Sequence, residues 1–142
     1  MEQCIKPAAV AIGTVMVVAA LLVAQTSAAK TTKSGSFYKV EISTKATGDD
    51  VVATIKITGK GGYGCNTLYP WKLTVTPGSG VEMAKTVLGK VDAAKFGKAA
   101  VIFEVRYVAR AGAGPMAAKL KLSGCDDKQC QMEQVDLSWP SR

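Results

Sequence analysis

The chain has 142 residues, a net charge of +7 and no histidine, which fits one domain and argues against a zinc site or a histidine-activated nucleophile. The positive charge favours anionic surfaces in general, but the lysines alternate along predicted strands instead of clustering. We therefore expect no nucleic-acid partner, no metal and no cofactor.

The first 29 residues have the order of an export signal. Lys6 lies near the start, residues 8–24 are uncharged and rich in Ala and Val, and the small residues Ser27 and Ala29 follow at the spacing that a signal peptidase recognises. The apolar stretch also reaches the short limit of about 17 residues for a membrane-spanning helix. We predict a signal peptide over residues 1–29, or a retained anchor over 8–24, and hence a periplasmic or extracellular domain.

Residues 30–36 are small and polar and are predicted to form a flexible lead-in, followed by one domain over 37–142. Runs of alternating apolar and polar residues, separated by Gly, Pro and Asp turns, predict strands. About seven such strands, with turns every 8–12 residues or so, are typical of an antiparallel β-sandwich of immunoglobulin-like type. The predicted strands are 37–45, 51–58, 68–76, 81–88, 99–109, 116–123 and 132–139.

The alternation also predicts which side chains face the core. Pro70 falls inside the third predicted strand, which indicates an edge position or a bulge there. Trp71 and Trp139 are expected to pack in or near the core. The other predicted core residues are Tyr38, Val40, Ile42, Ala53, Ile55, Ile57, Leu73, Val75, Val101, Phe103, Val105, Tyr107, Met116, Ala118, Leu120, Leu122, Val135 and Leu137.

Three cysteines follow the targeting segment: Cys65, Cys125 and Cys130. The last two are separated by four residues, between two predicted strands, so a hairpin turn would place them opposite each other. Paired hairpin residues have Cα atoms about 4.5 or 5.5 Å apart, within the disulfide range of about 4.4–6.8 Å. In an oxidising compartment we expect a Cys125–Cys130 disulfide.

Spacing alone leaves the role of this pair open between a redox-active bond and a structural staple. Closing a loop of about six residues contributes roughly 2.2 kcal/mol, against about 4.3 kcal/mol for a Cys65–Cys125 bridge. The close spacing therefore suits a bond that opens without unfolding the domain. Asp126 and Asp127 would raise a thiol pKa and Lys128 would lower it, so a passive dithiol exchanged by partners fits better than a self-activated one.

Cys65 directly follows residues 59–64 and belongs to the same glycine-rich connection. Three roles are open for it: a buried apolar cysteine, an intermolecular partner, or a third redox thiol. We favour a buried apolar cysteine.

The segment from Lys119 through Cys125 and Cys130 to Leu137 resembles the end of a DsbD-type amino-terminal domain, in which a strand, a cysteine pair four or five residues apart and a closing strand follow one another. The stretch from Gly61-Gly62-Tyr63 to Tyr69-Pro70-Trp71, and Lys85 through Phe96, extend the likeness over about residues 37–139.

The resemblance implies a periplasmic immunoglobulin-like sandwich in which Cys125 and Cys130 are the reacting pair. It also implies partners, namely a thioredoxin-like domain or membrane electron donor that supplies electrons and oxidised periplasmic proteins that receive them. No such domain follows in this sequence, so we expect a stand-alone form whose electrons come from another protein. The alternative function is a non-catalytic exported interaction or structural domain with a Cys125–Cys130 staple.

Overall fold

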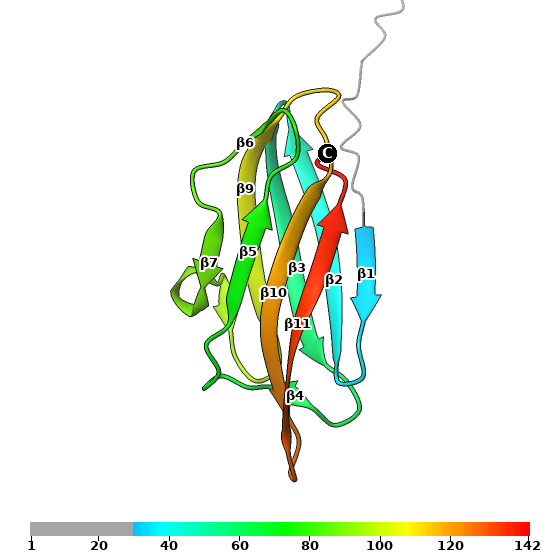
Figure 1. Cartoon of the computed structure of the whole chain (residues 1–142), viewed down its shortest axis with the longest axis vertical. Coiled ribbons are helices and arrows are strands. Elements are labelled where there is room, and N and C mark those ends of the chain that lie inside the picture. The colour runs from blue at the N-terminus through cyan, green and yellow to red at the C-terminus, as the bar shows by residue number, and fades with distance from the viewer. Residues whose placement is uncertain (1–29) are drawn as a thin grey trace, which may run out of the picture.

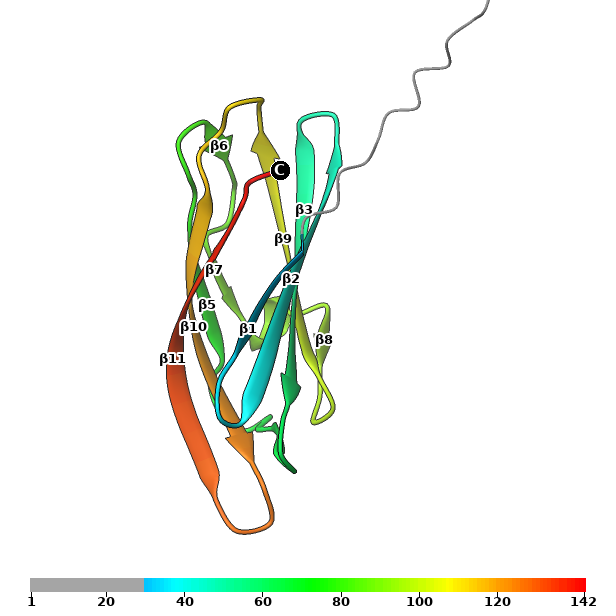
Figure 2. The ribbon, with the colours of Figure 1, turned by 90° about the vertical axis from the view of Figure 1, so that its right-hand side faces the viewer.

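The computed structural model describes residues 30–142 as two antiparallel sheets packed face to face (Figure 1; Figure 2). The predicted β-sandwich is confirmed. Within the described residues, no helix is long and apolar enough to span a membrane. The signal peptide or anchor predicted over residues 1–29 lies outside the described residues.

The first sheet has the strand order β1-β2-β3-β9-β6, and β8 also pairs with β9. All its neighbouring strands are antiparallel, and β2 and β3, of ten residues each, form a hairpin around the turn at Gly48. Its strands are β1 (Lys30–Ser34), β2 (Tyr38–Thr47), β3 (Asp50–Gly59), β6 (Val81–Glu82), β8 (Lys95–Phe96) and β9 (Val101–Ala109).

The second sheet has the order β11-β10-β5-β7, with the short β4 also pairing β10. A short 3-10 helix, η1 (Lys90–Asp92), follows β7. The strands of this sheet are β4 (Gly64–Cys65), β5 (Lys72–Thr76), β7 (Val87–Gly89), β10 (Met116–Cys125) and β11 (Cys130–Trp139).

The core lies between the sheets and is made by the inward side of the predicted alternation. Each predicted core residue is buried, including both tryptophans. The Trp71 indole N–H donates to the carbonyl of Asn66 at 2.7 Å, and that of Trp139 donates to the Tyr107 hydroxyl at 3.2 Å. The buried aromatic N–H groups are thus satisfied, as burial of polar groups requires.

Three predicted segments are corrected. Residues 30–34, predicted as flexible lead-in, form β1 and pair with β2 from Lys30↔Ser43 to Ser34↔Lys39. The strand predicted over 68–76 begins only at Lys72, so Pro70 lies before the strand and neither in it nor at a bulge. The strand predicted over 81–88 is two short strands, β6 and β7, which belong to different sheets.

Two contacts join the sheets where β1 and β2 face β11. The Tyr38 hydroxyl donates to the Glu133 carboxylate at 3.1 Å, and the Lys33 ammonium donates to the backbone carbonyl of Asp136 at 2.6 Å. Burial, followed by the hydrogen bond to Glu133 and its negative charge, raises the pKa of Tyr38 to about 12. Tyr38 therefore remains a neutral donor at neutral pH and holds β2 against β11.

Thr44 of β2 provides a test of the packing. Its side chain is buried and its hydroxyl finds no hydrogen-bond partner within residues 30–142. Thr44→Val keeps the shape and removes the unpaired hydroxyl, so we expect it to raise the free energy of unfolding by about 1 kcal/mol in urea titrations. Thr44→Ala, the control, should lower it because it leaves a void. A valine variant less stable than the wild type would contradict this account.

Candidate functional site

The cysteine pair closes a long hairpin. Strands β10 and β11 are paired without interruption from Met116↔Trp139 to Cys125↔Cys130. The two cysteines are the last pair before the turn, with Cα atoms 4.0 Å apart, and they form a disulfide. The predicted bond is therefore confirmed, and it sits on a hairpin that backbone pairing already holds in register.

The four-residue turn is organised by Asp126. Its carboxylate oxygen Oδ1 accepts the backbone N–H groups of Lys128 at 2.8 Å and Gln129 at 2.7 Å, and its own N–H donates to the Gln129 carbonyl at 2.9 Å. These two N–H groups, with a smaller contribution from the Tyr63 hydroxyl, lower the pKa of the Asp126 carboxyl. Asp126 is therefore ionised at neutral pH, and its negative charge opposes formation of a thiolate at the adjacent Cys125.

The two sulfur-bearing residues differ in access. Cys130 is exposed, whereas Cys125 is only partly so. The hairpin tip projects past the other strands at one end of the sandwich, and β1 begins toward the opposite end (Figure 1; Figure 2). A reactant can therefore approach Cys130 without moving any part of the core.

A tyrosine from the glycine-rich connection holds the hairpin from the side. The Tyr63 hydroxyl accepts the side-chain amide N–H groups of Gln129 and Gln131, both at 2.9 Å. The connection reaches this position through Gly61 and Gly62, whose φ angles of 63° and 84° are strained for other residues. Tyr63 thereby links residues on both sides of Cys130 to the body of the domain.

Cys65 lies near the pair in the sheet but on the other face. It pairs with Gly124, and Gly64 pairs with Cys125. Because successive side chains of a strand point to opposite faces, Cys65 faces the core and Cys125 faces away from it. The two sulfur atoms are thus separated by the sheet.

The surroundings of Cys65 are apolar. Its side chain is 6% exposed, and its thiol lies 3.7 Å from the carbonyl oxygen of Ile57. Burial raises the pKa of this thiol, so it stays protonated at neutral pH. The predicted burial of Cys65 is confirmed, and this environment does not suit a third redox thiol.

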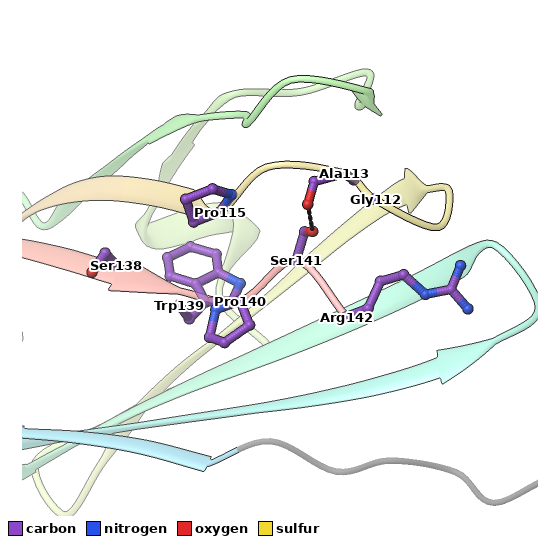
Figure 3. A pocket seen from close by; sticks show the side chains of 8 residues that line it. All are labelled: Gly112, Ala113, Pro115, Ser138, Trp139, Pro140, Ser141 and Arg142. Atoms are coloured by element: carbon purple, nitrogen blue, oxygen red, sulfur yellow. Dashed lines mark hydrogen bonds between the residues drawn. The ribbon is translucent and has the colours of Figure 1, made fainter.

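A surface hollow lies at the other end of β11, far from the disulfide along the strand (Figure 3). The Ser141 hydroxyl donates to the Ala113 carbonyl at 3.2 Å across it. Arg142, which also borders the hollow, donates to Asp49 and to the backbone carbonyls of Gly48 and Ala109. These hydrogen bonds hold Ser141 and Arg142 against the neighbouring turns and β9. The hollow therefore contains no cluster of reactive side chains.

The structure brings both predicted site residues together and adds four whose contacts the sequence analysis missed. An Asp that opens a four-residue turn is a known turn signal, so the role of Asp126 was open to prediction. Tyr63, Gln129 and Gln131 meet across more than 60 residues of sequence, and no local pattern indicates such a contact. Within residues 30–142, no three His, Cys, Asp or Glu side chains are placed to hold a metal ion.

Its two sheets make this chain an immunoglobulin-like β-sandwich. It is similar to the GAE domain of yeast GGA1, seen in a crystal structure, with 10% sequence identity and a TM-score of 0.50. The match covers 80% of this chain and 99% of that one, and at this identity it shows the fold alone. No protein-family model and no curated protein matches the chain.

The charge of Asp126 can be tested without disturbing the turn. Asp126→Asn keeps an oxygen that accepts the two turn N–H groups but removes the negative charge. Because the reduced state then forms a thiolate more easily, we expect the reduction potential of the Cys125–Cys130 bond to rise by on the order of 10 mV. The measurement is equilibrium titration against a glutathione buffer at pH 7.

Asp136→Asn is the matched control, because it removes the same charge from β11 at a position about 20 Å from Cys130 along the strand. It should leave the potential unchanged. A fall in potential for Asp126→Asn would contradict the electrostatic account.

Proposed function

We propose that this domain is a thiol–disulfide exchange module of the periplasm or another compartment outside the cytoplasm, with Cys125 and Cys130 as the reacting pair. The observation that carries the proposal is the place of the bond: it spans the last pair of a fully paired hairpin, at an exposed tip. The predicted export signal and the resemblance to DsbD-type amino-terminal domains support the same function.

The energetics favour a bond that can open. A loop closed by about six residues stabilises the fold by roughly 2.2 kcal/mol. The inward side chains of the same strand, Val135, Leu137 and Trp139, are buried, and each contributes about 1.5–3 kcal/mol or more. The hairpin is therefore held mainly by packing and backbone pairing, so reduction leaves it in place.

The electron flow has a defined direction under this proposal. A dithiol partner reduces the Cys125–Cys130 bond, and the resulting dithiol reduces the disulfide of a second protein. The partners are other exported redox proteins, with a thioredoxin-like domain or a membrane electron donor on the supply side. The ionised Asp126 and the lack of histidine favour a passive relay over a self-activated nucleophile.

The competing function is a non-catalytic exported domain whose Cys125–Cys130 bond is a staple. The reduction potential separates the two functions. A bond used for exchange should lie near or above about −230 mV, whereas a structural one lies below about −300 mV. We expect the higher value from titration against glutathione and dithiothreitol, and a bond that resists reduction until the domain unfolds would overturn the proposal.

Variants of the cysteines complete the test. A Cys125→Ser and Cys130→Ser double variant should remain folded and lose about 2 kcal/mol of unfolding free energy, measured with urea. A Cys65→Ala variant is the control, because it removes the buried thiol and should leave the reduction potential of the pair unchanged. A double variant that cannot fold would show that the bond is a staple.

A further inference from the structure

Within the described residues, no strand covers the outer edge of β11, and of its outward backbone groups the Asp136 carbonyl accepts a hydrogen bond from the Lys33 ammonium. Within residues 30–142 β11 pairs with β10 only, while β10 has β5 and β4 on its other side. Figure 1 shows β11 as the outermost strand of its sheet. At ten residues it is a long edge strand, and such an edge presents backbone groups that can pair with another chain.

The Lys33 contact shows which backbone groups face outward. Its ammonium group, which comes from the other sheet, donates to the Asp136 carbonyl, so that carbonyl points away from β10. In an antiparallel strand the N–H and C=O of one residue point to the same side, and the side alternates along the chain. The residues of β11 with outward groups are therefore Cys130, Met132, Gln134, Asp136 and Ser138.

The turn supports this assignment. The Gln129 carbonyl bonds to the N–H of Asp126, so Gln129 faces the partner strand and its neighbour Cys130 faces outward. Cys125 and Cys130 are then a pair that is not joined by backbone hydrogen bonds, in agreement with their short Cα separation of 4.0 Å. The outer edge of β11 thus extends as far as Cys130, the more exposed of the two disulfide cysteines.

We propose that an extended segment of the redox partner pairs with the outer edge of β11 and places its cysteine beside Cys130. A residue opposite Cys130 on an added strand would have its Cβ about 4.5–5.5 Å away on the same face of the sheet. Its sulfur, the Cys130 sulfur and the Cys125 sulfur would then form a row across three strands. This inference rests on the proposed function.

This alignment of the three sulfur atoms favours thiol–disulfide exchange. The partner thiolate attacks the sulfur of Cys130, the bond between the two domain sulfurs breaks, and Cys125 leaves as a thiolate with the electron pair. A second partner thiolate then attacks the partner sulfur of the mixed disulfide and releases Cys130. The partner is oxidised by two electrons and the domain is reduced by two.

The charges beside the edge of β11 indicate which kind of partner segment would bind there. Lys6 and Glu2 cancel, so residues 30–142 carry the whole net charge of +7. On the outward face, Lys121 and Lys119 of β10 lie next to Gln134 and Asp136 of β11, and neither lysine forms an ion pair within the described residues. Lys33 lies at the edge itself. An acidic extended segment fits this surface.

The test uses the full chain with Cys4→Ser, Cys65→Ala and Cys125→Ala, which leaves Cys130 as the reacting thiol. The probe is the symmetric disulfide of an eleven-residue peptide of alternating glutamate and valine with a central cysteine, long enough to pair with β11 from Cys130 past Gln134. The matched probe has alternate backbone amides N-methylated, which blocks strand pairing. Mass spectrometry follows the mixed disulfide at Cys130, with oxidised glutathione as the reference reactant.

We expect the unmodified peptide to react at least about tenfold faster than the methylated one, relative to glutathione, because only the former pairs with the edge. Gln134→Pro removes one outward N–H and should abolish this advantage, whereas Gln134→Ala keeps the N–H and should retain it. A peptide with lysine in place of glutamate should react more slowly than the acidic one.

Equal rates for the two acidic peptides would overturn the docking edge. The proposed function would then still be judged separately, by whether dithiothreitol reduces the wild-type bond in the folded domain. A wild-type protein that sediments as a dimer, and becomes a monomer on Gln134→Pro, would assign the edge to a second copy of this chain and overturn the partner segment.

Discussion

The register between β10 and β11 is the constraint on which the candidate site depends. Leu120 and Leu122 of one strand and Val135 and Leu137 of the other must all face the core, and this requirement fixes how the strands pair. A slip of β11 by one residue would turn Val135 and Leu137 toward water, while Leu120 and Leu122 would stay inward because β10 also pairs with β5. The same register places Cys125 opposite Cys130, so the apolar residues of the core determine where the disulfide forms.

This arrangement separates folding from the chemistry of the sulfur atoms. The inward side chains of β10 and β11 pack in the core, and hydrogen bonds of Tyr63 and Asp126 organise the tip of the hairpin. At the base of the tip, Gly124 lets the backbone approach Phe37, since an added Cβ would lie 2.7 Å from the Phe37 ring. The hairpin that carries the disulfide is thus also held by core packing, backbone pairing and these contacts at its tip, as the proposed exchange function requires.

Much of the sandwich was predictable because alternation reports directly on burial. It identified the core faces of β2, β3, β9, β10 and β11, and the C-x4-C spacing identified the disulfide. It missed β1, a polar edge strand whose pairing with β2 leaves no apolar pattern, and it joined β6 with β7, which lie in different sheets. The contacts of Tyr63 depend on the three-dimensional path of the glycine-rich connection, which local sequence does not encode.

The proposed function requires that the Cys125–Cys130 bond opens and closes while the domain stays folded. The most direct test is a pair of amide NMR spectra of the ¹⁵N-labelled protein, recorded before and after addition of dithiothreitol without denaturant. We expect reduction with shift changes confined to the hairpin tip and its Tyr63 contact, and with the signals of core residues such as Phe103 unchanged. A bond that stays oxidised, or reduction that collapses the dispersion of the whole spectrum, would contradict it.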